Sequence, residues 1–503
     1  MRSRQVVKSI VMTLLLQICT FICGLILPRL FISHYGSEVN GLMNSITQFL
    51  SYIVLLDSGV GAVVRSAFYK PLADKDERKL SGIVKASDSF FRKIALILVI
   101  YMVVLVVVYP RIVKTNHSFM YTSSLVLIIG ISSFFQYFFG MTNELLIKSD
   151  QKVWVSSLIQ IGTLLLNTIL TCILIIAGMP VHVVKLATCF MYILRPMVFY
   201  AYVHKHYHLD PDAKPDKEAL NQKWDGLGQH LAYFVHKNTD VVILTLMDSL
   251  KNVSVYSLYQ GIVTGIENVV TSLAQSITPT LGNMIALHEA DKLHQTFDMY
   301  EMLNAMLISV FYTTTALCIV PFMSLYMKGV SDANYIQPIF AYFLIASDAM
   351  YVFRCPYLDT CSAAGHFRQT NPGAYAEAIT NLVVSLLLVT RYHLAGIAFG
   401  TFLGMTLRTI YLIFYLRKNI LVRPAKKAFG TMGVTGMAMF VSFYCVKVVF
   451  RFPITNFGMW VLLGFASIIV CIVFTLLFFF LVYRQRTIVL ITKCVSVFRK
   501  QKG

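Results

Sequence analysis

About fourteen apolar stretches run along the chain, each close to the roughly 20 residues that a helix needs to cross a bilayer. Unpaired backbone groups are costly in hydrocarbon, so such stretches are expected to be helical. No polar stretch between them is long enough for a separate soluble domain. The sequence therefore predicts an all-α polytopic membrane protein with about fourteen transmembrane helices. These helices are expected near residues 7–32, 41–64, 94–113, 121–147, 154–177, 183–203, 228–248, 254–284, 301–327, 337–360, 374–390, 394–416, 429–449 and 458–483.

The distribution of charge agrees with this class and predicts an orientation. Only 13% of the residues are charged and 57% are hydrophobic, whereas a soluble domain carries about 25% charged residues. The net charge of +19 would suggest a nucleic-acid partner in a soluble protein, but here the basic residues lie between apolar stretches, so none is expected. With the N-terminus inside, about 30 of the 43 basic residues fall on the inner side. Both termini are therefore expected to be cytoplasmic.

The outer loops and the motif content argue against catalysis. The loops on the outer side are on the order of ten residues long, which is too short for an external catalytic domain. The chain has no P-loop and no Gly-x-Ser-x-Gly sequence, and its ten cysteines show no metal-ligand spacing. We expect no catalytic site, no metal and no cofactor. Residues 484–503 alternate basic and apolar side chains, which is typical of an amphipathic segment on the membrane surface.

The first and second parts of the chain resemble each other with a shift of about 214 residues. This shift aligns Asn167 with Asn381, and a shift of 213 aligns Arg195 with Arg408. Six spans separate equivalent positions, so both copies have the same orientation in the membrane, as in parallel transporter repeats. The shift of 214 also aligns residues 37–42 with 251–256 and residues 77–78 with 291–292.

The repeat predicts a cavity and divides the chain into four parts. Two such halves enclose a cleft, and transporters bind their substrate there near the bilayer midplane. The sequence therefore predicts a carrier with two six-helix parallel repeats around a central cavity and two further helices at the C-terminus. The parts are an N-terminal half (1–213), a C-terminal half (214–424), two extra helices (425–483) and a cytoplasmic amphipathic tail (484–503).

Basic residues inside the predicted spans are candidates for this cavity. An ionisable side chain within a span costs at least a few kcal/mol and usually faces a cavity or a partner. Lys237 lies near the midplane of the seventh span with Asp240 one turn later, so a structural ion pair is the alternative. For arginines near the inner side, snorkelling from a helix end is the alternative. The candidates, which together predict an anionic substrate, are Lys237, Arg195, Arg408, Arg29, Arg354 and Arg65.

Acidic residues inside the spans are candidates for ion coupling. At such depth a carboxylate can bind Na⁺ or exchange a proton. Asp57 precedes Arg65 by eight residues, a spacing that places both on one face of a continuous helix. The coupling candidates are Asp57, Asp240, Glu267 and Asp348. Three further acids lie near the inner ends of their spans and are expected to be solvated: Glu144, Asp359 and Glu377.

Several short motifs resemble those of a known family. They are Leu27–Leu30 (LPRL), Tyr35–Leu42 (YGSEVNGL), Leu56–Val60 (LDSGV), Asn238–Asp240 (NTD) and Val255–Tyr259 (VYSLY). The motifs resemble the corresponding helices of bacterial polysaccharide-export flippases, the O-antigen and capsule translocases of the multidrug/oligosaccharidyl-lipid/polysaccharide exporter superfamily. The resemblance covers about residues 7–420, and the fourteen-span plan fits the rest of the chain.

This resemblance implies a function and a location. Such proteins move an undecaprenyl-diphosphate-linked oligosaccharide from the inner to the outer leaflet of the bacterial inner membrane by alternating access, with Na⁺ or H⁺ counter-transport. An anionic diphosphate needs a basic, hydrated cavity, while the polyprenyl tail can stay in lipid. The implied partners are the lipid-linked substrate, membrane lipids, and the polymerase and other proteins of polysaccharide assembly.

Three other functions compete with this one. A drug/cation antiporter of the same superfamily would need an acidic, aromatic cavity, whereas the deep basic residues favour an anion. A membrane-embedded glycosyltransferase or polymerase would need a large outer loop and an acidic metal-binding pair. A scaffold for an envelope assembly would not need buried basic residues such as Lys237.

Overall fold

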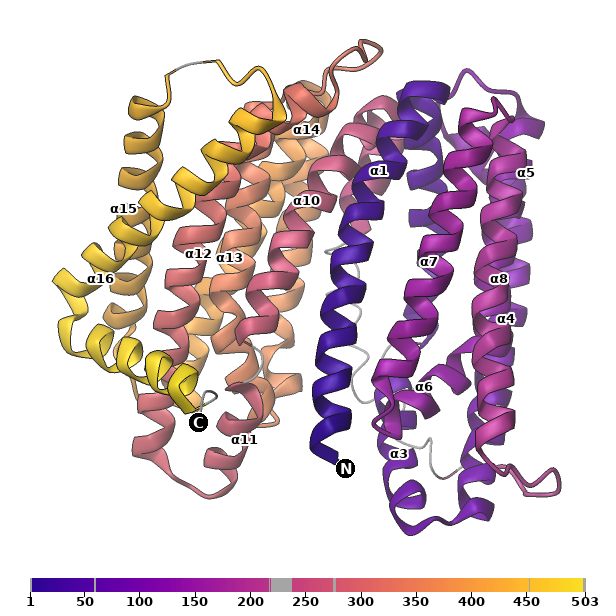
Figure 1. Ribbon diagram of the computed structural model, residues 1–503, viewed down its shortest axis with the longest axis horizontal. Coiled ribbons are helices and arrows are strands. Elements are labelled where there is room, and N and C mark those ends of the chain that lie inside the picture. The colour runs from indigo at the N-terminus through magenta and orange to yellow at the C-terminus, as the bar shows by residue number, and fades with distance from the viewer. Residues whose placement is uncertain are drawn as a thin grey trace. The chain divides into compact units, whose positions relative to one another are not determined.

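The structure is a computed structural model that describes residues 2–57, 60–216, 218, 238–274, 277–451 and 453–500. All regular structure in these ranges is helical, and most of the elements are labelled in Figure 1. They are α1 (Arg2–Ser51), α2 (Val54–Asp57), α3 (Val60–Asp74), α4 (Glu77–Ile112), α5 (Phe119–Phe135), the π-helix η1 (Gln136–Gly140), α6 (Met141–Ser149), α7 (Val153–Ile176), α8 (Val181–His206), α10 (Leu250–Ala274), α11 (Thr278–Ala286), α12 (Ala290–Tyr326), α13 (Pro338–Ala363), α14 (Phe367–Asn419), α15 (Ala425–Val449) and α16 (Phe457–Lys500), with a short helix at Asn238–Met247.

These helices confirm the predicted all-α polytopic membrane fold. Ten of the described helices are long and apolar enough to cross a bilayer. Two of the ten contain a sharp turn: α1 turns at Gly36, where φ is 84°, and α14 turns at His393, where φ is 49°. Each of these two therefore supplies two spans. Asn238–Met247 and α10 overlap the predicted spans 228–248 and 254–284, and residues 228–237 lie outside the described residues.

The chain forms two compact units, Met1–Ser257 and Leu258–Gly503. The predicted boundary between the two repeats lies earlier, at residues 213 and 214, and stays a prediction, as does the central cavity. Inside the first unit, the Asn40 amide donates to the Ser254 hydroxyl over 2.8 Å. These two residues are 214 positions apart, which is the repeat shift, so the bond joins equivalent positions of the two copies.

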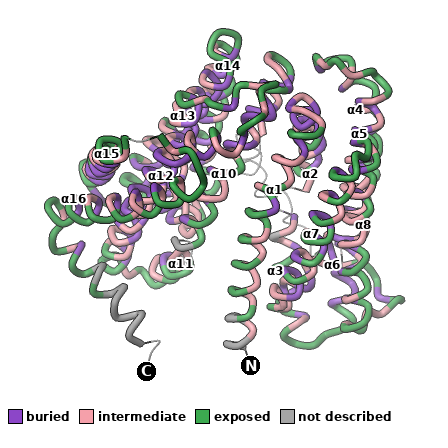
Figure 2. Tube along the Cα trace, turned by 45° about the horizontal axis from the view of Figure 1, so that its top comes forward, coloured by how far each residue is buried: buried purple, intermediate pink, exposed green. Residues whose placement is uncertain are grey.

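The second unit has its most buried helices at α12 and α13. In the most apolar 18-residue segment of each helix, 56% of the residues are buried, compared with 6% in the corresponding segment of α1. The C-terminal pair packs beside α12: Ser309 and Thr475 share a hydrogen bond of 2.8 Å, and the Trp460 indole donates to the Cys318 carbonyl over 3.0 Å. In Figure 2 exposed residues predominate on α16. Charged side chains on α13 are therefore surrounded by protein.

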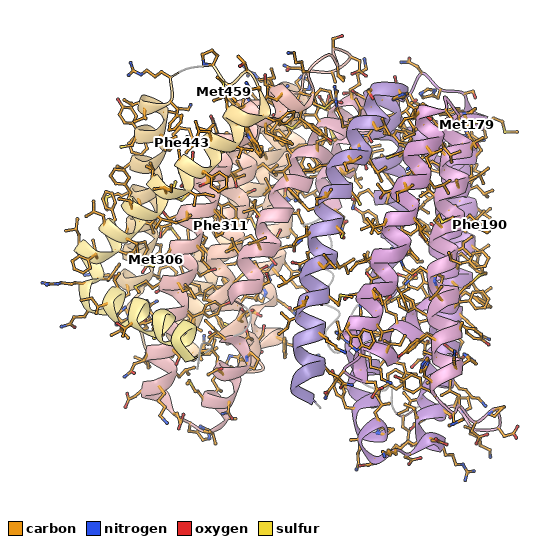
Figure 3. All side chains as sticks on the ribbon, viewed as in Figure 1. Met179, Phe190, Met306, Phe311, Phe443 and Met459 are labelled. Atoms are coloured by element: carbon orange, nitrogen blue, oxygen red, sulfur yellow. The ribbon has the colours of Figure 1, made fainter. Side chains whose placement is uncertain are left out.

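The outward faces of the helices are apolar. Phe190 of α8 is 65% exposed and points away from the helices of its unit, as Figure 3 shows. Similar side chains line α4 and α16, among them Ile100 and Leu481, which are 67% and 69% exposed. Soluble proteins rarely expose such large apolar surfaces, so these faces are suited to lipid.

Candidate functional site

Three glycines in the second arm of α14 position the most deeply buried charges. Gly396, Gly400 and Gly404 recur every fourth residue and so share one helix face. A methyl group on Gly404 would lie 2.9 Å from the carbonyl oxygen of Glu377, so the two arms of α14 pack backbone to backbone. Arg408 follows one turn later on the same face. The glycine stripe thus brings its guanidinium to Glu377.

Glu377 binds two arginines inside the second unit. Arg408 Nη1 lies 2.7 Å from Glu377 Oε2, and Arg354 Nη1, from α13, lies 2.9 Å from Glu377 Oε1. The three residues are only 4%, 1% and 1% exposed, in the order Arg408, Arg354, Glu377. The expectation that Glu377 is solvated is therefore wrong. The helix begins at Phe367 rather than near residue 374, which places Glu377 ten residues into it.

This Arg–Glu–Arg cluster carries an excess positive charge and two unused donors. Two guanidinium groups face one carboxylate, so the cluster has a net charge of +1. Within the part of the chain that the structure describes, the Nε atoms of Arg354 and Arg408 are buried and make no hydrogen bond. The Tyr351 ring covers Arg354, with its centroid 4.9 Å from the guanidinium carbon. The cluster can therefore accept further negative charge.

Two of the predicted coupling acids lie in the same unit. The Tyr312 hydroxyl donates to Asp348 Oδ2 over 2.6 Å, and Asp348 is 5% exposed. Glu267 of α10 is 6% exposed and interacts electrostatically with both Tyr312 and Cys355. The fold thus brings Asp348 and Glu267 to one buried region, where a cation or a proton would offset their charge. Their role in coupling stays a prediction.

Two acidic residues near the inner ends of their spans also have hydrogen-bond or ion-pair partners. Asp359, which was expected to be solvated, is partly buried and accepts hydrogen bonds from Tyr300 over 2.6 Å and Thr278 over 3.2 Å. The α13 helix continues to Ala363, so Asp359 lies within it rather than at its end. Glu144 is closer to the solvated state that was expected of it, because its side chain is 16% exposed and pairs with Lys148 over 2.6 Å.

A second ionic cluster joins α12 to the loop before α15. Arg423 binds Glu301 through both Nη atoms and lies 2.9 Å from Asp298 through Nε. Burial lowers the pKa of Arg423, but hydrogen bonds and attraction from Glu301 outweigh this effect and raise it. Asp298 also pairs with Arg486 of α16 over 2.9 Å. This cluster holds the C-terminal pair of helices to α12.

The first unit holds Arg195 in a different environment. Arg195 is only partly buried, and its Nε donates to the Thr163 hydroxyl over 3.1 Å. With the repeat shifts, Thr163 corresponds to Glu377 and Arg195 to Arg408. Equivalent side chains therefore meet in both units, but only the second pair is ionic.

The remaining candidates of the first unit are not gathered into one site. Asp240 is 2% exposed and accepts a hydrogen bond from Tyr256 over 2.9 Å. Arg29 is partly buried on α1. Lys237 lies outside the described residues, so its predicted pairing with Asp240 stays a prediction.

The second predicted span, residues 41–64, is not one continuous helix, because α1 ends at Ser51 and a turn follows before α2. Asp57 lies in α2, where it is hydrogen-bonded to Tyr137. Arg65 lies in α3, is exposed, and donates to the Gly61 carbonyl over 3.3 Å. Residues 58 and 59 lie outside the described residues, so the shared helix face of Asp57 and Arg65 stays a prediction.

The fold and these buried charges define a polytopic helical membrane protein with a polar interior. No family model and no curated protein matches the sequence. Among solved structures, the chain is similar to the lipid II flippase MurJ in an inward closed conformation, with a TM-score of 0.72 and 14% identity over 94% of this chain and 99% of that one.

Two multidrug transporters share the same fold. An inward-facing MATE family transporter of the MOP superfamily matches with a TM-score of 0.60 and 12% identity over 80% of this chain and 94% of that one. A ligand complex of the MATE multidrug transporter DinF-BH matches with a TM-score of 0.60 and 12% identity over 85% of this chain and 96% of that one. The expected likeness in fold to flippases and transporters of this superfamily is confirmed.

Sequence reasoning missed Glu377 as the centre of the buried cluster. Two signals in the sequence could have found it. The glycine stripe leads directly to Arg408, and the 214-residue shift that aligns Asn167 with Asn381 also pairs position 163 with position 377. An acid at that position, facing a stripe of small residues, predicts a buried partner for the arginine.

Proposed function

We propose that this chain is a flippase that moves an undecaprenyl-diphosphate-linked oligosaccharide from the cytoplasmic to the outer leaflet of a bacterial inner membrane by alternating access. The observation that carries the proposal is the likeness in fold to the lipid II flippase MurJ over nearly the whole of both chains. The short motifs of α1 and α10 that resemble polysaccharide-export flippases point to the same kind of substrate.

The extent of the structural matches favours a flippase over a multidrug antiporter. The two MATE structures match 80% and 85% of this chain, whereas the MurJ structure matches 94%. The difference is comparable in size to the C-terminal pair α15 and α16, which contain 25 and 44 residues. A chain that includes the helices α15 and α16 is therefore more similar in extent to the flippase than to the two multidrug transporters.

The charge of the second unit favours an anionic substrate. Arg354 and Arg408 together carry one more charge than Glu377 neutralises, and this excess lies in a low-dielectric interior where it attracts anions strongly. A diphosphate group is such an anion, whereas the cationic drugs of an antiporter would be repelled. Arg195, Arg29, Arg65 and Lys237 remain candidates for contacts to the same substrate.

Ion coupling and the biological setting complete the proposal. Asp348, beside Tyr312 and in the same buried region as Glu267, is the leading candidate to bind Na⁺ or a proton, with Asp57 and Asp240 as further candidates. Both termini are cytoplasmic, and the product serves surface polysaccharide synthesis, whether O-antigen, capsule or exopolysaccharide. A polymerase that uses the flipped substrate is the expected functional partner.

Reconstituted protein tests the proposed activity directly. Proteoliposomes would contain a fluorescently labelled undecaprenyl-diphosphate oligosaccharide, and an impermeant quencher would report the fraction on the outer leaflet. A flippase makes the inner-leaflet fraction accessible within the assay, while protein-free vesicles keep it protected. Protein that leaves this fraction protected but accumulates a cationic fluorescent dye would show that the chain is a multidrug transporter instead.

The same vesicles test the coupling ion. A Na⁺ gradient or a pH gradient is imposed separately, and we expect only one of them to accelerate flipping. Asp348→Asn should abolish that acceleration, whereas Asp332→Asn, a change in the exposed loop between α12 and α13, should leave it intact. Equal acceleration in the wild type and Asp348→Asn would exclude Asp348 from coupling.

A further inference from the structure

We propose that Glu377 is an internal substitute for the phosphate groups of the substrate. Its carboxylate holds Arg354 and Arg408 while no substrate is bound, and a substrate phosphate replaces it during transport. The inference rests on the proposed function and adds a residue that sets the affinity of the site. The inference also means that Arg354 and Arg408 bind the phosphate groups of the substrate rather than its sugars.

The charge balance of the cluster supports this exchange. With Glu377 as its only counter-charge among the described residues, the cluster keeps a net charge of +1 although its members are at most 4% exposed. A purely structural ion pair would be expected to balance its charges, because an uncompensated buried charge is costly. A diphosphate carries at least two negative charges and would neutralise both arginines.

The donor geometry supports it as well. Each arginine gives one Nη1 donor to Glu377, and the Nε of each is buried without a hydrogen-bond partner among the described residues. A carboxylate offers two oxygens, and Glu377 already uses one for each arginine. The diphosphate of the substrate offers four non-bridging oxygens and binds guanidinium groups through pairs of parallel hydrogen bonds, which would engage the Nε donors.

Tyr351 covers one face of the cluster. Its side chain is half-buried, lies one turn before Arg354 on α13, and has its ring over the guanidinium. In the proposed exchange this ring moves aside, and the phosphate reaches Arg354 from the face that the ring covers.

The equivalent position of the first unit has no acid that a phosphate could replace. Thr163 replaces the acid and cannot compete with a phosphate for Arg195, which is only partly buried. An arginine that is never occupied by an internal anion would bind anionic lipids without discrimination. The exchange therefore belongs to the second unit alone.

Binding measurements on three variants test the exchange. Glu377→Gln keeps the shape of the side chain but removes its charge, so the affinity for radiolabelled undecaprenyl diphosphate should rise by about tenfold. Arg354→Gln should weaken binding, and the double variant Arg354→Gln/Glu377→Gln should recover it. The double variant also keeps the net charge of the wild-type cluster, which protects the test if Glu377→Gln alone fails to fold.

Glu144→Gln is the matched control. Glu144 is likewise a glutamate in a spanning helix with a basic partner, Lys148, but it lies outside the cluster. Its removal should leave the affinity unchanged. An equal gain in affinity in Glu144→Gln and Glu377→Gln would reduce the effect to overall charge and overturn the inference.

Further probes distinguish the source of the phosphate. The gain in Glu377→Gln should be largest for undecaprenyl diphosphate, smaller for undecaprenyl monophosphate, and absent for phosphatidylglycerol vesicles. A gain confined to phosphatidylglycerol would show a phospholipid site and overturn the inference. Wild-type protein that binds none of the polyprenyl phosphates would overturn the proposed function. If the wild type binds them and Glu377→Gln binds them with the same affinity, only the role of Glu377 is overturned.

Discussion

The first hairpin (α7 and α8) and the second hairpin (the two arms of α14) occupy equivalent places in the sequence repeat but hold their arginines differently. In the first hairpin, Arg195 is half-buried and donates to the neutral Thr163. In the second, Arg408 is buried and pairs with the charged Glu377. The position of the arginine is shared, and the charge of its partner and the depth of its burial are not.

Packing explains why only the second hairpin buries its charge. Gly396, Gly400 and Gly404 let its two arms approach closely, so water is excluded from the arginine that follows them. In the first hairpin the equivalent positions carry Val183, Ala187 and Met191. The first hairpin therefore has no matching glycine stripe. A buried charge thus needs both a close interface and an acid to balance it.

The third member of the cluster is likewise confined to the second unit. With the 214-residue shift, Arg354 corresponds to Gly140, which ends the π-helix η1. A methyl group on Gly140 would already lie 3.0 Å from the Cβ of Pro196, so a long side chain does not fit there. At these equivalent positions, the three-residue charged cluster is therefore confined to the second unit.

Removal of the central acid should have the largest effect. Glu377→Ala leaves two buried guanidinium groups unpaired and should lower the free energy of unfolding by about 3–5 kcal/mol. Thr163→Ala removes a single hydrogen bond to a partly buried arginine and should cost only about 1 kcal/mol. Thermal unfolding of both variants in the same detergent measures the difference. Similar losses in the two would show that the second cluster is not a buried charge centre.

Filling the glycine stripe should have the next largest effect. Gly404→Met introduces the residue of the first hairpin and forces it against the backbone of Glu377, which should destabilise the protein by about 1–3 kcal/mol. Gly433→Met is the control, because a Cβ at Gly433 of α15 meets no atom within 4 Å. Only the first variant should lose stability in the unfolding assay.

The turns of the two hairpins offer a smaller contrast. The first hairpin turns through Gly178 at a φ of 72°, whereas the second uses His393 at a φ of 49°. A side chain in this left-handed region costs about 1 kcal/mol, which glycine avoids. His393→Gly should therefore raise the stability by about that amount, and Gly178→Ala should lower it similarly. A loss of stability in His393→Gly would show that the imidazole makes a contact worth more than the strain.

Conversion of the first hairpin to the second should have the smallest effect. Thr163→Glu places an acid beside Arg195, but because Arg195 is only partly buried, the new ion pair should contribute at most about 1 kcal/mol. A double-mutant cycle with Arg195→Gln measures this coupling. Coupling as strong as that between Glu377 and Arg408 would mean that burial does not distinguish the hairpins.

Much of the fold could be predicted because it depends on local composition. Apolar stretches of about 20 residues must be helices in a bilayer. The number and order of the helices could therefore be predicted from the sequence, and so could the alignment of Arg195 with Arg408. The helix ends were harder to predict, because polar residues can extend a helix beyond its apolar part. For this reason the second span was wrongly drawn through Tyr52, and Glu377 was placed too close to the surface.

Hydropathy along the chain is enough to predict a helical protein that crosses a membrane many times and has basic residues in its spans. Which of those residues meet depends on the packing of the helices. Arg354, Glu377 and Arg408 lie on three different helical segments, and their pairing depends on how closely the arms of α14 pack against each other and against α13. Hydropathy reports the depth of a residue in the membrane, but a partner is set by packing across the fold.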